Sequence, residues 1–263
     1  MAKKLDVEET WRGFLTGTHP SMKWERRVLK RLPTAPRCKL CNAPFAGPGG
    51  VMMRMIGKQR SRKNPKYCNM CTIQTRNLSE GGAEVQLSLL FADVRGSTTL
   101  AERMTPMEFS RLMNRFYEVA NRILIDSDAL VDKLVGDEVI GLYLPYLNDH
   151  PARAIQAARE LLRATGHTDP RGPWLPVGAG LHTGVAYVGI VGTEDTVSDL
   201  TALGDSVNIT ARLASLAGPG EILISDAAYG AARLDLGDLE HRNLQLKGRS
   251  EPVGVRVLRI TPA

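Results

Sequence analysis

The chain has 263 residues, of which 43% are hydrophobic and 24% charged, a balance that excludes a disordered or fibrous protein. No stretch approaches 18 uninterrupted apolar residues, so the sequence predicts no membrane-spanning segment. Its first residues, MAKKLDVEETWRG, carry acids where a secretory signal would be apolar, which predicts a cytoplasmic protein.

The net charge of +6 is distributed unevenly along the chain. Residues 1–84 carry a balance of +11, whereas residues 85–263 carry −5. A small polar stretch with two glycines, residues 79–84, separates the two parts and predicts a boundary there. We expect a basic helical segment over 1–37, a four-cysteine module over 38–80 and a larger domain over 85–263.

The first predicted element is a short basic helix in SMKWERRVLKRL. Trp24, Val28 and Leu32 recur every four residues, which predicts an apolar stripe along it. This stripe suits an anionic membrane surface, a nucleic acid, or packing against the neighbouring domain or a second subunit. In the simplest interpretation it packs internally and the cations are solvated.

All four cysteines lie in the basic part, as Cys38-x-x-Cys41 and, 26 residues later, Cys68-x-x-Cys71. A reducing cytosol argues against disulfides. Two such pairs can surround one tetrahedral ion, and four sulfur ligands favour a closed structural Zn²⁺ site. An iron–sulfur cluster uses the same ligands and stays an alternative.

Apolar runs of strand length alternate with helical segments from residue 85 onwards. A strand over 85–93 precedes a helix that begins at a capping box, Thr105-Pro106-Met107-Glu108. A hairpin follows over 129–144, with Gly136 and Asp137 at its turn.

The remaining elements complete a βαββαβ order. We expect a helix over 150–165, a pair of strands over 176–192 around Gly184, and a helix over 205–218. This order predicts an α+β fold of the ferredoxin-like type, with a small N-terminal module held by metal.

Two aspartates stand out in this frame, because Asp93 closes the first strand and Asp137 lies in the hairpin turn. If the strands are neighbours, the two carboxylates converge and suit Mg²⁺ or Mn²⁺. Gly96, Ser97 and Thr98 follow Asp93, and their backbone N–H groups can face a polyphosphate. Taken singly, each aspartate is more typical of a structural role, Asp93 as a loop acid that caps Ser97 or Thr98 and Asp137 as a turn residue.

Four ordered motifs resemble the class III nucleotide cyclase catalytic domain: FADVRGST (91–98), KLVGDE (133–138), ALGDSVNITAR (202–212) and LKGR (246–249). The resemblance covers about residues 85–260 and leaves the basic N-terminal part outside.

The resemblance implies a role for each matching residue. Asp93 and Asp137 would bind two Mg²⁺ or Mn²⁺ ions, Asn208 would position the ribose, and Arg212 would stabilise the transition-state phosphate. Lys247 matches the lysine that binds the triphosphate. Asn208 and Arg212 lie four residues apart, so a helix places both on one face.

Base selection resembles the adenylyl pattern, with Lys133 and Thr201 at the positions that read the purine. A lysine donates to N1 of adenine and meets the N1–H of guanine unfavourably. One departure is Gly178, where several family members carry an arginine for the triphosphate. Arg95 or a residue of the N-terminal part is a possible substitute.

The resemblance thus implies that ATP is converted to 3′,5′-cyclic AMP and pyrophosphate. The metals and phosphates would come from one subunit, and Lys133, Thr201, Asn208 and Arg212 from the other, which predicts a homodimer with two sites. A cyclase acting on GTP or a pyrimidine nucleotide is an alternative. So is a catalytically silent protein whose metal module binds nucleic acid or a partner. Regulation by the N-terminal module is expected.

Overall fold

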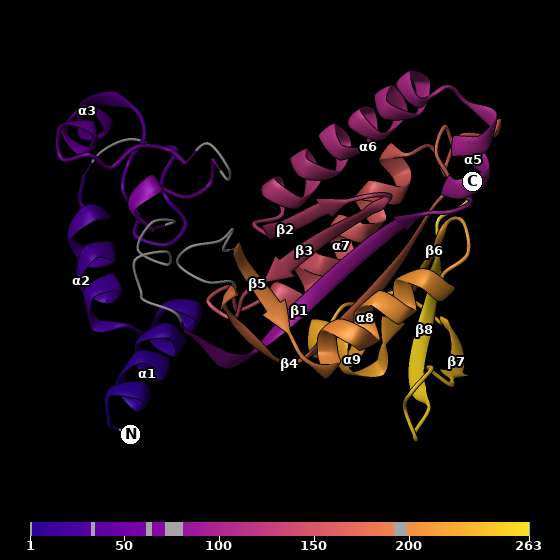
Figure 1. Ribbon diagram of the computed structural model, residues 1–263. Coiled ribbons are helices and arrows are strands. Elements are labelled where there is room, and N and C mark those ends of the chain that lie inside the picture. Colours follow the sequence, from indigo (N-terminus) through magenta and orange to yellow (C-terminus); the bar gives the residue numbers. More distant parts are fainter. Residues whose placement is uncertain (1, 33–34, 62–64, 72–80, 192–198, 263) are drawn as a thin grey trace. The chain divides into compact units, whose positions relative to one another are not determined.

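The computed structural model of the protein describes residues 2–32, 35–61, 65–71, 81–191 and 199–262, and the chain divides into two compact units (Figure 1). The first unit comprises Met1–Val85, Leu144–Asn148 and Ala186–Leu203, and the second comprises Gln86–Tyr143, Asp149–Val185 and Gly204–Ala263. The division near 79–84 stays a prediction, because residues 72–80 lie outside the described part of the chain.

The first unit contains the helices α1 (Ala2–Thr16), α2 (Pro20–Leu29) and α3 (Gly47–Met55). Both α1 and α2 lie within the segment expected to be helical, residues 1–37. The buried Trp11 and Leu15 of α1 lie one helical turn apart.

The predicted basic helix exists as α2, but the interpretation in which its apolar stripe packs internally is wrong. Met22 and Leu29 are buried, whereas Trp24 is 65% exposed and Val28 is 40% exposed. Met22 and Leu29 are two turns apart and therefore share a face, while Leu32 lies beyond the end of the helix.

One mixed sheet runs through the described residues in the order β2-β3-β1-β4-β6-β8-β7, with β5 paired to β4 (Figure 1). Its strands are β1 (Gly82–Val94), β2 (Leu130–Val135), β3 (Glu138–Tyr143), β4 (Val177–Val191), β5 (Asp199–Leu203), β6 (Glu221–Ser225), β7 (Glu240–Leu244) and β8 (Val253–Arg259). β1 lies between β3 and β4 and is buried on both faces, which explains its continuous apolar run.

The second unit contains the helices α5 (Ser97–Arg103), α6 (Pro106–Asp126), α7 (His150–Ala164), α8 (Asp205–Leu216) and α9 (Asp226–Ala232). The succession β1, α6, β2, β3, α7, β4 is the predicted βαββαβ order, so the α+β fold is confirmed. The predicted capping box also exists: Glu108 N–H donates to the Thr105 hydroxyl oxygen, and Thr105 N–H donates to the Glu108 carboxylate.

Residues 177–191 form one long strand, so the predicted pair of strands around Gly184 is wrong. The two halves of β4 pair with different partners, residues 179–181 with β6 and residues 187–191 with β5. A change of partner within one strand leaves the residue alternation unbroken, so the sequence carries no sign of it.

Helix α8 packs on one face of the sheet and α7 on the other (Figure 1). Ile209, Leu213 and Ala217 of α8 and its end form a buried cluster with residues of β6 and β8. A Cβ atom at Gly180 would lie 2.3 Å from the backbone nitrogen of Ala214, so glycine permits the close approach of α8 to β4. This packing positions α8, which carries Asn208 and Arg212.

Candidate active site and candidate metal centre

Asp93 and Asp137 lie at the same end of neighbouring strands. Asp93 is the Cα partner of Glu138 in the antiparallel ladder of β1 and β3, and Asp137 directly precedes Glu138. The backbone N–H of Val94 donates to the carbonyl oxygen of Asp137 at 3.0 Å. The structure therefore brings these two sequence-predicted residues together.

Arg95 contacts the first of the two carboxylates and lies near the second. Its guanidinium donates to Oδ2 of Asp93 and, at 2.7 Å, to the carbonyl oxygen of Ser215 in α8. Burial lowers the pKa of Arg95, and the charges of Asp137 and Glu138 oppose that shift. Asp93 thus contacts the Arg95 guanidinium directly, and Asp137 is near enough to act on it through its charge.

The loop after β1 contributes a further polar group near Asp137. Gly96 adopts a left-handed conformation, φ 71°, immediately before α5, and the Ser97 hydroxyl donates to Oδ2 of Asp137. Burial and the neighbouring Asp137 raise the pKa of Glu138. Thr98, also predicted at this loop, is exposed.

The guanidinium of Arg212 lies next to the turn that contains Lys247 and Gly248. Its Nη1 and Nη2 atoms are 3.7 Å from the position of a Cβ atom at Gly248. Nη1 is buried and has no hydrogen-bond partner among the described residues. Buried donors are nearly always paired in folded proteins, so this guanidinium is suited to an anionic ligand.

Asn208 and Lys247 are both exposed and therefore accessible to a ligand. Sequence reasoning missed Arg249, whose guanidinium pairs with Asp205 at the start of α8. Its Nε atom is buried without a partner in the described part of the chain. The LKGR motif contains this residue, but its pairing with a residue 44 positions away leaves no local signal.

The two predicted base readers lie in different units. Lys133 is in β2 of the second unit, and its side chain lies outside the described part of the structure. Thr201 is buried in β5 of the first unit, where Gly189 of β4 is its Cα partner.

Gly178 faces the backbone that follows α8. A Cβ atom there would lie 2.6 Å from the carbonyl oxygen of Ala217 and 3.0 Å from that of Gly218. The arginine that other family members carry at this position has no room here, so the departure follows from the packing of β4 against the end of α8.

We expect Gly178→Ala to lower the free energy of unfolding by about 1–3 kcal/mol, because the new methyl group overlaps fixed backbone atoms. Gly230→Ala is the matched control, since a Cβ atom at Gly230 in α9 would meet no atom within 4 Å. That control should be neutral or slightly stabilising. Urea unfolding measures both, and equal stability of the two variants would contradict the packing argument.

Protonation of His182 is expected to lower the stability of the folded protein in mild acid. Its Nδ1 atom and the Ser225 hydroxyl are 2.9 Å apart, and burial lowers its pKa from 6.5 to about 4. Between these two values the unfolded chain binds a proton that the folded chain lacks, so stability falls as the pH is lowered.

From pH 7 to pH 5 we expect His182 to account for a loss of about 1–2 kcal/mol in the free energy of unfolding. Urea unfolding at both pH values should show a smaller loss for His182→Asn than for wild type. His241→Asn, at an exposed histidine, should keep the wild-type loss. An identical pH dependence of all three proteins would contradict the assignment.

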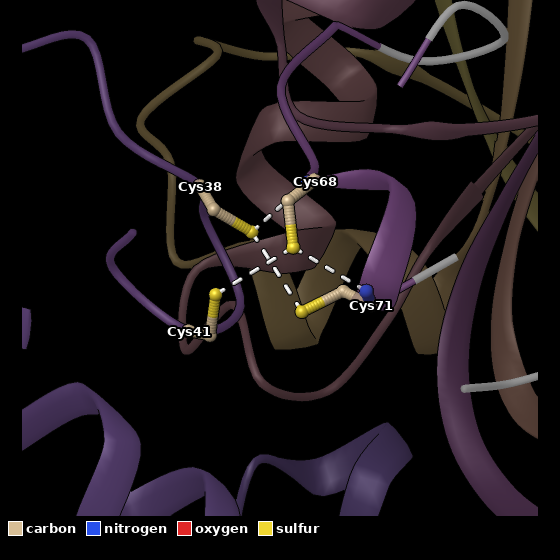
Figure 2. A group of neighbouring side chains, drawn as sticks. All are labelled: Cys38, Cys41, Cys68 and Cys71. Carbon is tan, nitrogen blue, oxygen red and sulfur yellow. Dashed lines mark hydrogen bonds between the residues drawn. The ribbon is translucent and has the colours of Figure 1, made fainter. Parts of the chain in front are cut away.

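The four cysteines converge in the first unit (Figure 2). Their sulfur atoms all lie within 4.8 Å of one another, with 3.8 Å between Cys38 and Cys71 and 3.7 Å between Cys41 and Cys68. Four ligands at about 2.3 Å from a central ion form a tetrahedron with edges of about 3.8 Å. The sulfur positions therefore fit a tetrahedral Zn²⁺ centre.

Backbone and side-chain contacts hold this arrangement. The N–H of Cys68 donates to the sulfur of Cys38 at 3.2 Å, and the N–H of Cys71 donates to the sulfur of Cys68 at 3.3 Å. Cys38, Cys41 and Cys68 are fully buried in one cluster with Leu29, Ala43, Met53 and Tyr67. Hydrogen bonds to sulfur are typical partners of metal-bound thiolates.

None of the helices among the described residues combines the length and the apolar character that crossing a bilayer requires.

Known proteins with similar sequences include adenylate cyclases. The chain is 30% identical over 149 residues to an adenylate cyclase of Anabaena cylindrica, covering 53% of this chain and 29% of that protein. It is 30% identical over 169 residues to an adenylate cyclase of Mycobacterium tuberculosis, covering 62% of this chain and 37% of that protein. The chain thus spans well under half the length of these relatives.

Two solved structures share the fold. The guanylyl cyclase Cya2 superposes with a TM-score of 0.62 at 27% identity, over 67% of this chain and 93% of that one. The adenylyl cyclase CyaB from P. aeruginosa superposes with a TM-score of 0.59 at 28% identity, over 67% of this chain and 95% of that one. Residues 82–257 match the adenylate and guanylate cyclase catalytic domain, and the chain belongs to that family.

Proposed function

We propose that this protein is a nucleotide cyclase that converts ATP to 3′,5′-cyclic AMP and pyrophosphate. The observation that carries the proposal is the adjacency of Asp93 and Asp137 at the ends of two paired strands, in a chain of the cyclase family. Two carboxylates with only oxygen donors suit Mg²⁺ or Mn²⁺. Two such ions per site would acidify the attacking hydroxyl and neutralise the phosphates.

The reaction takes place within one substrate molecule. The ribose 3′-oxygen attacks the α-phosphorus, the bond from that phosphorus to the oxygen bridging to the β-phosphate breaks, and pyrophosphate leaves. The hydroxyl proton passes to solvent. Because both reacting groups belong to the substrate, the protein contributes chiefly by fixing their geometry.

Residues of α8 and of the turn after β7 provide the clamps in this proposal. Arg212 stabilises charge on the α-phosphate, a role that its buried and unpaired Nη1 atom supports. The exposed Asn208 positions the ribose, and the exposed Lys247 binds the triphosphate. Backbone N–H groups of Gly96, Ser97 and Thr98 contribute to phosphate binding.

We place each site between two copies of the chain. Asp93 and Asp137 of one subunit then act with Lys133, Thr201, Asn208 and Arg212 of the other, and a homodimer has two equivalent sites. Adenine is the favoured base because a lysine at position 133 donates to its N1 acceptor. Similar solved structures include both a guanylyl and an adenylyl cyclase, so this preference depends on Lys133 and Thr201.

Product analysis tests the proposal. Purified protein is incubated with Mn²⁺ and, separately, ATP, GTP, CTP and UTP, and the products are identified by mass spectrometry. We expect cyclic AMP from ATP and at least about tenfold less product from GTP, because a hydrogen-bond donor that loses its acceptor costs about 1–3 kcal/mol. A preference for another nucleotide would contradict the assignment of the base, and no cyclic product from any would contradict the activity.

The four thiolates belong to the same proposal as a structural Zn²⁺ centre, which the 3.7 and 3.8 Å sulfur separations support. A regulatory role for this module is supported by the Tyr67 hydroxyl, which hydrogen-bonds to the Tyr146 hydroxyl. Tyr146 lies in the segment that directly follows β3, the strand that begins after Asp137. Through this hydrogen bond, a structural change in the metal module can displace the segment after β3 and thereby affect the strand that follows Asp137.

A further inference from the structure

The outward face of α2 carries cations beside apolar side chains. Lys23 and Arg27 lie one helical turn apart, and Trp24 and Val28 each follow one of them by one position. All four side chains are exposed, and that of Trp24 by 65%. We call these four residues the α2 face.

The opposite side of α2 is fully engaged within its own unit. Met22 and Leu29 are buried, and the Glu25 carboxylate accepts a hydrogen bond from Nζ of Lys58 at 2.8 Å. Arg37 donates to the carbonyl oxygen of Leu29 at 2.8 Å. These contacts fix the helix with the α2 face outward, so internal packing does not account for the exposed tryptophan.

Helix α3 of the same unit also exposes an apolar stripe. Val51, Met52, Met55 and Ile56 are exposed at helical spacing, Met55 by 82% and Ile56 by 58%. Met53, on the other side, is buried beside the cysteines. Several exposed apolar side chains side by side are typical of a surface that binds a protein, a ligand or a membrane.

We propose that the α2 face binds the headgroup region of an anionic phospholipid bilayer, with the α3 stripe as a second point of insertion. Tryptophan is enriched at the boundary between headgroups and acyl chains, and lysine and arginine are attracted to anionic lipids. Both kinds of side chain occur on one face of α2, a combination characteristic of interfacial helices.

Charge and side-chain chemistry favour this occupant over two others. Residues 1–84 carry a balance of +11, so two copies would repel each other through this surface. A single-stranded nucleic acid binds through stacking of successive bases on several aromatic rings, whereas Trp24 is the one aromatic side chain among the four residues of the α2 face and the four of the α3 stripe. Flexible aliphatic side chains gain stability only where acyl chains or other apolar groups surround them.

Vesicle flotation with the full chain tests the proposal. We expect binding to phosphatidylcholine vesicles that contain phosphatidylserine, and at least about tenfold weaker binding to pure phosphatidylcholine vesicles. Trp24→Ala and the double substitution Lys23→Gln with Arg27→Gln should each weaken binding to the anionic vesicles by about tenfold.

Matched controls come from the second unit. Met107 of α6 has the same 65% exposure as Trp24, so Met107→Ala removes an equally exposed apolar side chain. Arg103→Gln with Arg111→Gln removes two exposed helical cations. Both controls should keep wild-type vesicle binding, and circular dichroism should show all variants folded because every substituted side chain is exposed.

Equal binding to both kinds of vesicle, or binding unaffected by the α2 substitutions, would overturn the proposal. Binding of an oligonucleotide that the α2 substitutions abolish, without vesicle binding, would assign the face to nucleic acid instead. Cyclase activity with Mn²⁺ and ATP in vesicle-free solution should be unchanged in every variant. That assay therefore reports on the proposed function separately from membrane docking.

Discussion

Mixing the Asp93→Ala and Arg212→Ala proteins is expected to restore cyclase activity that neither protein has alone. Each substitution removes a group that acts on transition-state charge, so each protein should lose at least about 10²–10³-fold in kcat. The proposed site takes Asp93 and Arg212 from different subunits, and a mixed dimer therefore keeps one intact site of two. With free subunit exchange at equal concentrations, the mixture should reach about a quarter of wild-type activity.

A protein with both substitutions in one chain is the decisive control. Paired with wild type, it gives mixed dimers in which one site lacks Asp93 and the other lacks Arg212, so neither works. Adding it to wild type should therefore lower activity, whereas the two single variants rescue each other. Both outcomes follow from the shared site alone, because the same two substitutions are present in both experiments.

Subunit exchange has to be measured alongside, for example by energy transfer between differently labelled proteins. If mixed dimers form and the mixture of single variants stays inactive, the shared-site proposal is wrong. Activity of the single variants at wild-type level would instead remove Asp93 and Arg212 from the site.

The framework of the site could be predicted because its signals are local. A strand that ends in Asp93, a Gly-Asp turn at 136–137 and a capping box at Thr105 each depend on residues close in sequence. Strand pairing then brings Asp93 beside the turn without further information. The four cysteines were equally accessible to sequence reasoning, because the spacing of metal ligands is itself a local pattern.

The partners of these residues could not be predicted, because they come from distant parts of the chain. Arg95 contacts Ser215, 120 residues away, and Arg249 pairs with Asp205. The interpretation of which face of α2 is buried was wrong for a related reason. Its stripe of Trp24 and Val28 is as regular as that of a packed helix, but the neighbours of α2, such as Lys58 and Arg37, select the other side.

Neighbours distant in sequence also explain why position 178 holds a glycine. Family resemblance leads to the expectation of an arginine there, while the proximity of Ala217 and Gly218 requires a residue without a side chain. Arg95 contacts Asp93 and α8, and it is one of the cations that we expect to take the place of that arginine. The substrate-binding cations in this chain are therefore best sought in Arg95, Arg212 and Lys247.

Loss of the metal from the four-cysteine centre should unfold the module that surrounds the four cysteines. The buried cluster around the metal site is small: it consists of Cys38, Cys41 and Cys68 with Leu29, Ala43, Met53 and Tyr67, and the partly buried Leu32, Leu40, Phe45, Cys71 and Tyr146 pack against it. Such a small core does not offset the conformational entropy of folding. Binding of Zn²⁺ to four thiolates contributes on the order of 10 kcal/mol, comparable to the total stability of many domains.

Metal analysis of the purified protein should give about one zinc per chain, and Cys41→Ser should reduce this to near zero. The same variant should lose the hydrogen-exchange protection of residues 38–61 and 65–71 in the absence of any denaturant. Met53→Ala is the matched control, because it removes a buried side chain of the same cluster and leaves every sulfur in place. It should keep its zinc and cost about 2–5 kcal/mol in the free energy of unfolding.

Replacement of the zinc by Co²⁺ provides a direct view of the ligands, since four thiolates around Co²⁺ give intense charge-transfer absorption that Cys41→Ser should abolish. Iron with matching sulfide in the purified protein would assign the site to an iron–sulfur cluster. A metal-free protein with residues 38–61 and 65–71 still protected would show that the core folds on its own. In that case the sulfur separations near 3.8 Å would need another cause, because four uncharged thiols gain little from meeting at tetrahedral distances.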